Sequence, residues 1–554
     1  MNELIEKFLT AKDGETVTLE RGKTYDVYDD DCLLVKGLYC SNTATKEENP
    51  EGIRRTAMYL DGKKNIVVDG NGATVLIHGV MTPFVFTRCE NITVKNLTVD
   101  YARPTMNEFT VLENNDGVCL LKINPESTFE IRGDKLVWVG EKKADGCYRW
   151  ENTYKNENTL TMYLMKGEER LFFMRGEEGD CRPSVPTFSS LERIDEYTVK
   201  AVMKNKQTKF PVGATVQSRV IVRDQLGGFF ERCKNLLFEG LRICFMHGLG
   251  MLSQYCENVT YRNCDCTPKE GRTFTSNADF FQFSGCKGEI VVENNKAYGS
   301  HDDFINVHGT HLRVVEQNEE EKSVVVRFMH NQSWGFQAFD VGDEIEFIHS
   351  DTLIPYGKNC VKRVERLGDT DIKLYLDAYL PPICVGKDVV ENCTWTPNLT
   401  VKGNYFGYSA ARGVLCTTRG NVLIENNTFY KNAGAVLLVA DDCNFWFESG
   451  YTRNVLFRNN KVIHCGFGNG SGCSKEICVL PEVIGESSEF VHESLKIIGN
   501  EFLQPCGGKH VWELRYLRSA HIVENSFDGE WEIQAKVCGD IVKKNNKEKV
   551  ERHA

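Results

Sequence analysis

The sequence predicts an all-β protein, a right-handed parallel β-helix that carries two small inserted β-barrel domains. Three observations support this fold class: one short phrase recurs, its copies are irregularly spaced, and two long stretches lack it. The phrase is an asparagine, three β-forming residues, one or two polar residues and then often Asn or Gly. Its copies begin at Asn65, Asn91, Asn235, Asn258, Asn398, Asn421 and Asn454, with weaker copies around Ile497 and Ile522.

The spacing of the copies is typical of β-helix coils. Neighbouring copies lie 26 residues apart (65 to 91), 23 (235 to 258), 23 (398 to 421) and 33 (421 to 454). Asn and Gly tolerate the left-handed conformation that a sharp corner requires, and stacked asparagine side chains can hydrogen-bond from coil to coil. The signatures of leucine-rich repeats and propellers are absent from the 554 residues. We therefore expect short parallel strands joined by Asn or Gly corners.

The phrase also divides the chain into domains. Two stretches without it read as strands separated by charged turns, and each is long enough for a small β-barrel. The first 45 residues are expected to cap the open end of the solenoid, because an uncapped end would expose a sheet edge. The predicted division is 1–115 for the N-terminal cap and first coils, 116–224 for the first inserted β-barrel, 225–311 for the catalytic coils, 312–397 for the second inserted β-barrel and 398–554 for the C-terminal coils.

The 22 cysteines follow the same repeat. Cys89, Cys233 and Cys256 each precede a repeat asparagine by two residues, and Cys286 holds the matching place before Gly288. A residue that recurs at one coil position predicts an interior stack of small apolar groups, with buried and reduced thiols. A metal or redox site at 264–266 is the alternative, but it lacks a second pair of ligands at a suitable spacing.

Bulk properties exclude several partners. A net charge of −12 is unfavourable for a nucleic-acid partner, which usually requires a basic face. No apolar run approaches the roughly 18 residues that span a bilayer, so no membrane partner is expected. The segment Met1–Phe8 has no basic region followed by an apolar one, so a cytoplasmic location is expected, with export open if a leader has been removed. The oligomeric state is not predicted.

Two successive coils, Asn277–Gly285 and His301–Gly309, hold the densest run of unusual polar residues. They align at a spacing of 24, and stacked coils lie roughly 4.8 Å apart. Asp279, Asp302 and Asp303 should therefore gather within a few ångströms. Like charges that close raise one another's pKa, which gives a protonated acid beside an ionised base, the pair that glycoside hydrolysis requires. Aspartates that only make turns before strands are the alternative, and the polar neighbours favour the catalytic reading.

Other side chains are expected to line the same face and to contact the substrate. For each of them a purely structural role is the alternative, and for Trp334 that role is an ordinary aromatic of a barrel core. No metal ion or organic cofactor is expected. The candidate substrate-binding residues are His247, Gln254, Gln282, Asn306, His308, Trp334, Arg412, Trp446 and Glu448.

The chain resembles glycoside hydrolase family 110. The resemblance is carried by Asp279–Gly288, His301–Thr310, Ala411–Gly413 and Trp446–Gly450. It implies a β-helix with two β-barrel insertions and an inverting exo-α-galactosidase that removes terminal α-1,3-linked galactose, as on blood group B glycans. It also implies that Asp279, Asp302 and Asp303 are the essential aspartates, and that the partner is a small neutral oligosaccharide or glycan end.

Three other classes of β-helix protein remain as alternatives. A polygalacturonase-like hydrolase is expected to show Gly-His-Gly and Arg-x-Lys elements after the Asp-Asp pair, and neither is present. A polysaccharide lyase or epimerase needs a basic residue beside a uronate carboxylate, and a non-catalytic adhesin-like β-helix has no reason to collect carboxylates.

The spacing of the carboxylates bears on the stereochemistry of hydrolysis. Directly stacked carboxylates lie about 5 Å apart, which suits a retaining enzyme, whereas an inverting enzyme needs about 6.5–9.5 Å. The sideways offset of Asp302 from Asp279 is expected to supply that separation, so we predict inversion.

Overall fold

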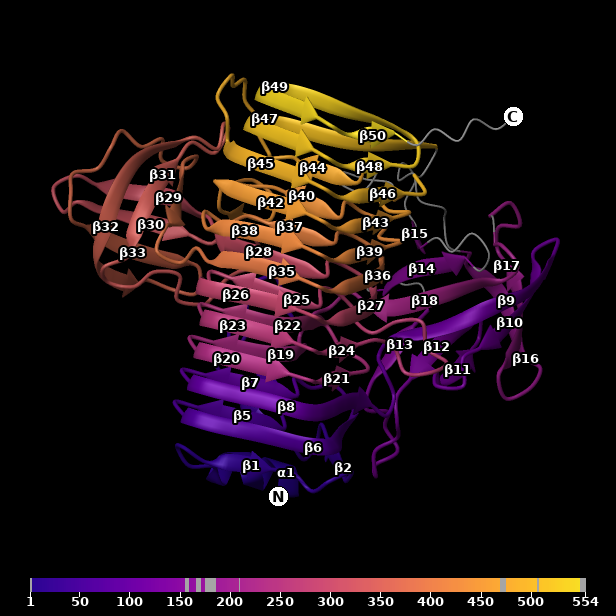
Figure 1. Ribbon diagram of the computed structural model, residues 1–554. Coiled ribbons are helices and arrows are strands. Elements are labelled where there is room, and N and C mark those ends of the chain that lie inside the picture. The colour runs from indigo at the N-terminus through magenta and orange to yellow at the C-terminus, as the bar shows by residue number, and fades with distance from the viewer. Residues whose placement is uncertain are drawn as a thin grey trace.

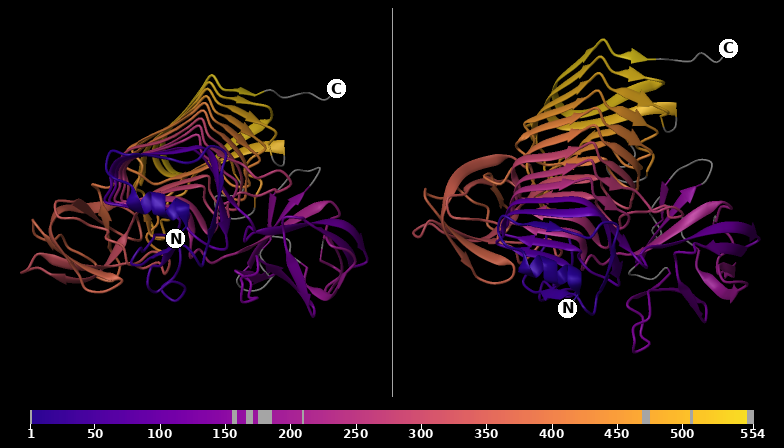
Figure 2. Two further views of the ribbon diagram at one scale, coloured as in Figure 1. Left: turned by 90° about the horizontal axis from the view of Figure 1, so that it is seen from below. Right: turned by 60° about the horizontal axis from the view of Figure 1, so that its bottom comes forward.

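The computed structural model describes residues 2–154, 159–165, 171–174, 186–208, 210–468, 475–505 and 508–548. A long solenoid of parallel strands forms the body of the protein, and two side domains project from it (Figure 1). Viewed along the solenoid, the coils lie over one another and the two insertions stand on either side (Figure 2). The predicted parallel β-helix with two inserted domains is confirmed.

Each coil places strands in three columns that run along the solenoid. The first column, here called the site column, contains β5 (Met58–Asp61), β7 (Phe84–Thr87), β19 (Leu226–Glu231), β22 (Leu249–Gln254), β25 (Phe281–Ser284), β28 (Ile305–Thr310), β37 (Val414–Cys416), β40 (Leu437–Val439) and β44 (Ile477–Val479).

The second column contains β1 (Thr16–Thr18), β6 (Lys64–His78), β8 (Glu90–Tyr101), β20 (Lys234–Glu239), β23 (Glu257–Arg262), β26 (Lys287–Glu293), β35 (Asn398–Lys402), β38 (Asn421–Glu425), β42 (Asn454–Arg458) and β45 (His492–Ile498). The third contains β2 (Thr24–Tyr28), β21 (Arg242–Ile243), β24 (Asp265–Cys266), β27 (Lys296–Ser300), β36 (Tyr405–Ser409), β39 (Thr428–Tyr430), β43 (Lys461–Ile463), β46 (Glu501–Leu503), β48 (Ser526–Phe527) and β50 (Lys547–Glu548). The last long strands, β47 (Lys509–Val523) and β49 (Glu530–Lys544), pair with each other along their length.

Four of the seven repeat asparagines form the left-handed corners that the sequence predicts. Asn65, Asn91, Asn235 and Asn258 have φ values of 56°, 56°, 56° and 59°, in the left-handed region. Their side chains form a ladder in which each amide donates to the carboxamide oxygen of the coil before it, at 2.8 Å in all three steps. The asparagine therefore both turns the chain and ties one coil to the next, which explains its recurrence.

The cysteines also lie where the repeat places them. Cys89, Cys233, Cys256 and Cys286 are buried and free. The backbone N–H of Cys89 donates to Sγ of Cys233 at 3.4 Å, so these two coils stack thiol on thiol. The predicted interior stack of reduced cysteines is confirmed.

A short helix, α1 (Glu3–Thr10), covers the N-terminal end of the solenoid (Figure 2). Its cap is Asn2, whose side-chain oxygen accepts the N–H of Leu4 at 3.0 Å, and its apolar face buries Leu4, Ile5 and Phe8 against the first coils. The strands β3 (Leu33–Val35) and β4 (Arg54–Thr56) pair antiparallel with each other. Among the described residues, no helix has the length and apolar character that crossing a lipid bilayer requires.

The first insertion is an antiparallel domain of two sheets. Within the described residues its main sheet has seven strands in the order β15-β14-β18-β9-β10-β17-β16 and does not close on itself. A three-stranded sheet packs near it, and both contribute to one apolar core that includes Phe109, Trp138 and Phe188. This core is covered by a second sheet instead of by barrel closure. The strands are β9 (Asn107–Asn115), β10 (Val118–Ile123), β14 (Thr159–Met165), β15 (Leu171–Met174), β16 (Phe188–Arg193), β17 (Thr198–Met203) and β18 (Ala214–Val220), with β11 (Phe129–Arg132), β12 (Lys135–Val139) and β13 (Glu151–Thr153) in the smaller sheet. Because β9 belongs to it, the insertion begins before residue 116.

The second insertion is a closed barrel of strands in the order β29-β30-β33-β32-β31-β34. It leaves the solenoid directly after β28 and returns to it at β35, so its position is fixed by the coil that follows Asp302 and Asp303. Its strands are β29 (Leu312–Asn318), β30 (Ser323–Arg327), β31 (Glu344–Ile348), β32 (Pro355–Arg366), β33 (Asp371–Leu376) and β34 (Val389–Asn392).

Candidate active site

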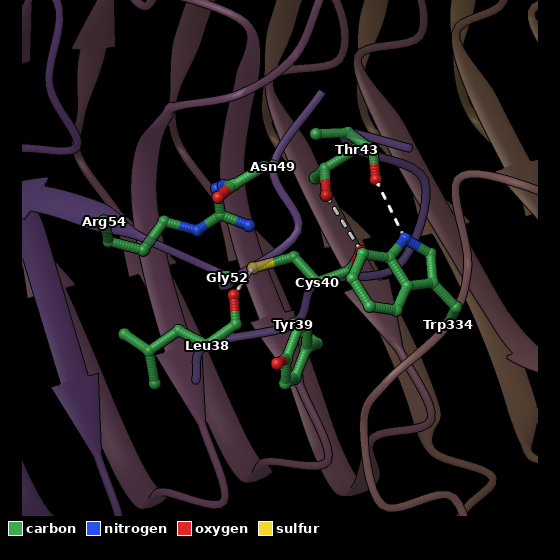
Figure 3. Close-up of a pocket in the computed structure, with 9 residues that line it drawn as sticks. Leu38, Tyr39, Cys40, Thr43, Asn49, Gly52, Arg54 and Trp334 are labelled. Carbon is green, nitrogen blue, oxygen red and sulfur yellow. Dashed lines mark hydrogen bonds between the residues drawn. The ribbon is translucent and has the colours of Figure 1, made fainter. Parts of the chain in front are cut away.

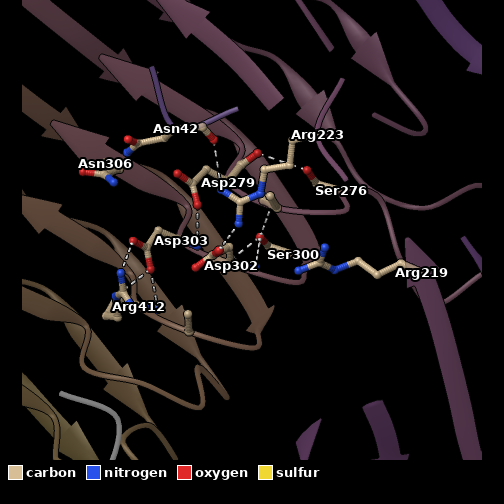
Figure 4. Close-up of polar contacts among 12 residues, drawn as sticks. Asn42, Arg219, Arg223, Ser276, Asp279, Ser300, Asp302, Asp303, Asn306 and Arg412 are labelled. Carbon is tan, nitrogen blue, oxygen red and sulfur yellow. Dashed lines mark hydrogen bonds and ion pairs between the residues drawn. The ribbon is translucent and has the colours of Figure 1, made fainter. Parts of the chain in front are cut away.

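Three aspartates meet at the start of two adjacent strands of the site column. Asp279 lies just before β25, and Asp302 and Asp303 lie just before β28. The two strands pair in the register that the 24-residue spacing predicts, and the N–H of Asp303 donates to Oδ1 of Asp279 at 3.1 Å. One carboxylate oxygen from each aspartate lies within 4.8 Å of the other two (Figure 4). We call these three residues the carboxylate trio.

Burial sets the trio apart from ordinary aspartates. Asp279 is 4% exposed, and its burial, followed by the charges of Asp302 and Asp303, raises its pKa well above the usual value. Asp303 is 1% exposed, and its burial raises its pKa to about 7 although Arg412 opposes the shift. Near neutral pH the trio therefore holds at least part of a proton among its members, which is the state required of a general acid.

Two arginines hold the trio from opposite sides (Figure 4). Nη2 of Arg223 donates to Oδ2 of Asp302 at 2.9 Å. Arg412 donates two hydrogen bonds to Asp303, from its backbone N–H to Oδ1 and from Nη2 to Oδ2, both at 2.9 Å. The three carboxylate oxygens are close enough for a metal ion, but these guanidinium groups already supply the positive charge. The arrangement is that of carboxyl groups that share protons.

A fourth carboxylate joins the site from a later coil. Glu448 lies in β41 (Glu448–Ser449), which pairs antiparallel with the end of β28. Its Oε1 accepts from Nδ2 of Asn306 at 3.3 Å and lies 3.7 Å from Nε2 of His308. Nδ1 of His308 donates to the carbonyl of Gly309 at 2.7 Å, which leaves Nε2 to accept from the amide of Gln282 at 2.8 Å. Four of the predicted binding residues are thus brought together.

Asn42 connects these two groups of residues, and sequence reasoning missed it. Its Nδ2 donates to Oε1 of Glu448 at 2.7 Å, and its Oδ1 accepts from the hydroxyl of Ser333 at 2.9 Å. Its carbonyl accepts from Nη1 of Arg223 at 3.3 Å, the same arginine that holds Asp302. With φ at 55°, Asn42 occupies the left-handed region, which asparagine tolerates better than most residues. Arg223 and Ser333 carry no signal in the sequence either.

Comparison with known proteins assigns the chain to a family. A family model described as "GLAA-B beta-barrel domain II" matches residues 323–390, and one described as "Right handed beta helix region" matches 385–527. Alpha-1,3-galactosidase A of Bacteroides thetaiotaomicron is 36% identical over 77% of this chain and 72% of its own length. This chain belongs to the α-1,3-galactosidase family. Alpha-1,3-galactosidase A of Bacteroides fragilis (31%) and alpha-1,3-galactosidase B of Parabacteroides distasonis (30%) each match 88% of this chain and 78% of their own length. The right-handed sense of the β-helix agrees with the matched description.

In this member of the α-1,3-galactosidase family, two predicted binding residues hold an N-terminal segment instead of facing the site. Gln254 is buried, accepts the N–H of Ser41 at 2.8 Å and donates to the carbonyl of Tyr39 at 2.9 Å. Trp334 is also buried, and its indole N–H donates to the carbonyl of Ala44 at 3.2 Å (Figure 3). Trp334 is therefore a core aromatic of the second insertion. Gln254 and Trp334 therefore fix the position of the N-terminal segment that contains Asn42.

His247 likewise has protein partners on both ring nitrogens. Nδ1 lies 2.6 Å from the hydroxyl of Thr105, and Nε2 lies 3.2 Å from Oδ1 of Asp224. Because Asp224 is the neighbour of Arg223 in the chain, His247 steadies the backbone that carries this arginine. Trp446, in contrast, stands at the surface near Glu448.

The buried Asp279 gives this α-1,3-galactosidase family member a pH-dependent stability. Its folded pKa is raised above 3.8, so its contribution to stability is fully present below that pH and is lost as the pH rises through the raised value. Asp279→Asn keeps the oxygen that accepts from Asp303 but cannot ionise. We expect the variant to gain stability over the wild type by about 1.4 kcal/mol per pH unit within that window. Thermal melting at pH 5 and pH 8 measures this, and an equal difference at both pH values would contradict it.

Proposed function

We propose that this protein is an exo-acting glycoside hydrolase of family 110 type that removes terminal α-1,3-linked galactose from neutral oligosaccharides or glycan ends. The observation that carries the proposal is the carboxylate trio, in which two buried members have raised pKa values and the third is paired with Arg223. It occurs in a chain of the α-1,3-galactosidase family, whose named relatives cover most of its length.

In the proposed reaction, the trio divides the acid and base roles. Asp303, with a pKa of about 7, is suited to donate its proton to the glycosidic oxygen as the bond between that oxygen and C1 breaks. Asp302 has the most accessible side chain, at 25% exposed, and Arg223 orients it. It would accept a proton from the water whose oxygen bonds to C1. Asp279 fixes the backbone of Asp303, and the charge of Asp302 favours the protonated form of Asp303.

The stereochemical course that we propose is inversion, with β-galactose as the first product. Its support is the resemblance to family 110. The sideways offset of Asp302 does not supply the wider separation that was expected from the sequence. The approach of the three carboxylates within 4.8 Å is shorter than the about 6.5–9.5 Å usual for inverting pairs. Under inversion the attacking water must therefore lie on the open side of Asp302 and not between the carboxyl groups.

Hydrolysis of α-1,3-galactobiose followed by proton NMR tests both parts of the proposal. We expect free galactose whose first detectable anomer is β. An α-anomer that appears first would overturn inversion and leave the galactosidase activity in place. Polygalacturonate is the second arm: we expect no faster cleavage, because the trio, Glu448 and the net charge of −12 all disfavour a uronate. Preferential cleavage of polygalacturonate would overturn the substrate assignment.

A further inference from the structure

Two aromatic rings from distant parts of the chain are in contact at the surface beside Glu448. The Trp446 side chain, between β40 and β41, is 43% exposed, and its ring centroid lies 4.3 Å from that of His330, at an interplanar angle of 32°. His330 belongs to the second insertion, between β30 and β31. The next residue to Trp446, Phe445, is 65% exposed. Large apolar rings held in contact yet open to water are the usual mark of a binding surface.

The loop that presents Trp446 is held rigidly. The carboxylate of Asp442 accepts the backbone N–H groups of Asn444 at 2.6 Å, Phe445 at 2.8 Å and Phe447 at 3.2 Å, together with that of Trp446. Burial would raise the pKa of Asp442, but these hydrogen bonds and one from Glu482 hold it below its usual value. The backbone that presents the ring is therefore preorganised, so little backbone freedom is lost when a ligand packs on it.

Both rings are tied to the catalytic cluster by short stretches of chain. Trp446 is two residues from Glu448, which accepts from Asn42 and Asn306. His330 is three residues from Ser333, which donates to Asn42. Burial lowers the pKa of His330, although Glu448 and Asp442 oppose the shift, so its ring is neutral at neutral pH. The pair of rings thus carries no charge and lies near Glu448.

We propose that the Trp446–His330 pair forms a binding subsite for the sugar ring that carries the terminal galactose, the leaving group of the reaction. A pyranose has one face of C–H groups, and packing that face on the indole removes apolar surface from water while its hydroxyl groups stay solvated at the edge. An uncharged aromatic surface suits a neutral sugar. This inference rests on the proposed function, and it assigns the acceptor specificity of the same site.

The test compares two substrates that share the galactose but differ in the leaving group. α-Galactosyl fluoride has no acceptor sugar, whereas α-1,3-galactobiose has one. Trp446→Ala is expected to raise KM and lower kcat/KM for galactobiose roughly tenfold, as for loss of one aromatic stacking contact, and to leave hydrolysis of the fluoride unchanged. Trp446→Phe should restore most of the loss. Tyr379→Ala is the matched control, because Tyr379 is an aromatic of the second insertion that is 80% exposed.

Each outcome decides the proposal. A loss confined to galactobiose supports the subsite. An equal loss on both substrates would mean that Trp446 acts through the structure of the catalytic cluster, and no loss on either would mean that the acceptor sugar binds elsewhere; both overturn it. If the wild type cleaves neither substrate, the proposed function fails and the subsite falls with it.

Discussion

Replacing Asp279, Asp302 or Asp303 by asparagine is expected to lower turnover of an α-1,3-galactoside at least about 10²-fold, the low end for the loss of a general acid or base. Asparagine keeps the size of the side chain and one hydrogen-bonding oxygen, but it can neither donate the proton to the glycosidic oxygen nor accept one from water.

The control for this experiment is Asp265→Asn. Asp265 lies in β24 of the neighbouring column and pairs with Arg242 at 3.1 Å, so it matches the trio in residue type and in having an arginine partner. We expect this variant to retain turnover and all four proteins to melt cooperatively. Full activity in Asp302→Asn and Asp303→Asn would rule out the trio as the catalytic group.

Asn42 is expected to give the second largest effect, although it is not placed to touch the scissile bond. Asn42→Gly keeps the left-handed backbone and deletes the side chain that donates to Glu448. Asn42→Asp puts a carboxylate in place of that donor, so two like charges face each other. Because small displacements of catalytic groups cost up to about 10²-fold in rate, we expect tenfold to hundredfold losses in kcat.

The pH profile separates a positioning role from a merely structural one. In Asn42→Asp the new carboxyl can share a proton with Glu448 at low pH, which restores a donor, so activity should recover on the acid side. A loss that is parallel at every pH would contradict this role. Asn65→Gly is the control, because Asn65 has the same left-handed backbone but its side chain accepts from Asn91 in the asparagine ladder.

Periodic features of the sequence predicted the parts of the structure that repeat. The asparagine phrase predicted the coils because its copies supply left-handed corners, as at Asn65 and Asn258, and the 24-residue spacing predicted the trio because adjacent coils must stack in register. The residues missed by this reasoning come from segments outside the repeat. Asn42 meets Ser333 and Glu448 across separations of 291 and 406 residues, and no local pattern records such contacts.

The lack of a local signal for long-range contacts also explains why two residues were wrongly predicted to bind the substrate. Gln254 and Trp334 are polar or aromatic residues near the site in sequence, but the N-terminal segment covers both and takes up their hydrogen bonds. Residue type alone does not tell whether a side chain will meet a substrate or another part of the chain. The first insertion was expected to be a small β-barrel because it reads as strands separated by charged turns and is long enough, but such strands are equally compatible with an apolar face covered by a second sheet.

The order of the site residues along the chain has a consequence for biosynthesis. The nascent chain carries the whole trio once residue 303 has left the ribosome, but Arg412 and Glu448 follow 109 and 145 residues later (412 − 303 and 448 − 303). At about 5–20 residues per second, the second delay is roughly 7–30 s. During that interval the second insertion emerges and the chain must return to the solenoid before the clamp on Asp303 can form. The hydrogen bonds of Arg412 to Asp303 and of Asn42 to Glu448 can therefore form only after that barrel and the next two coils have been made.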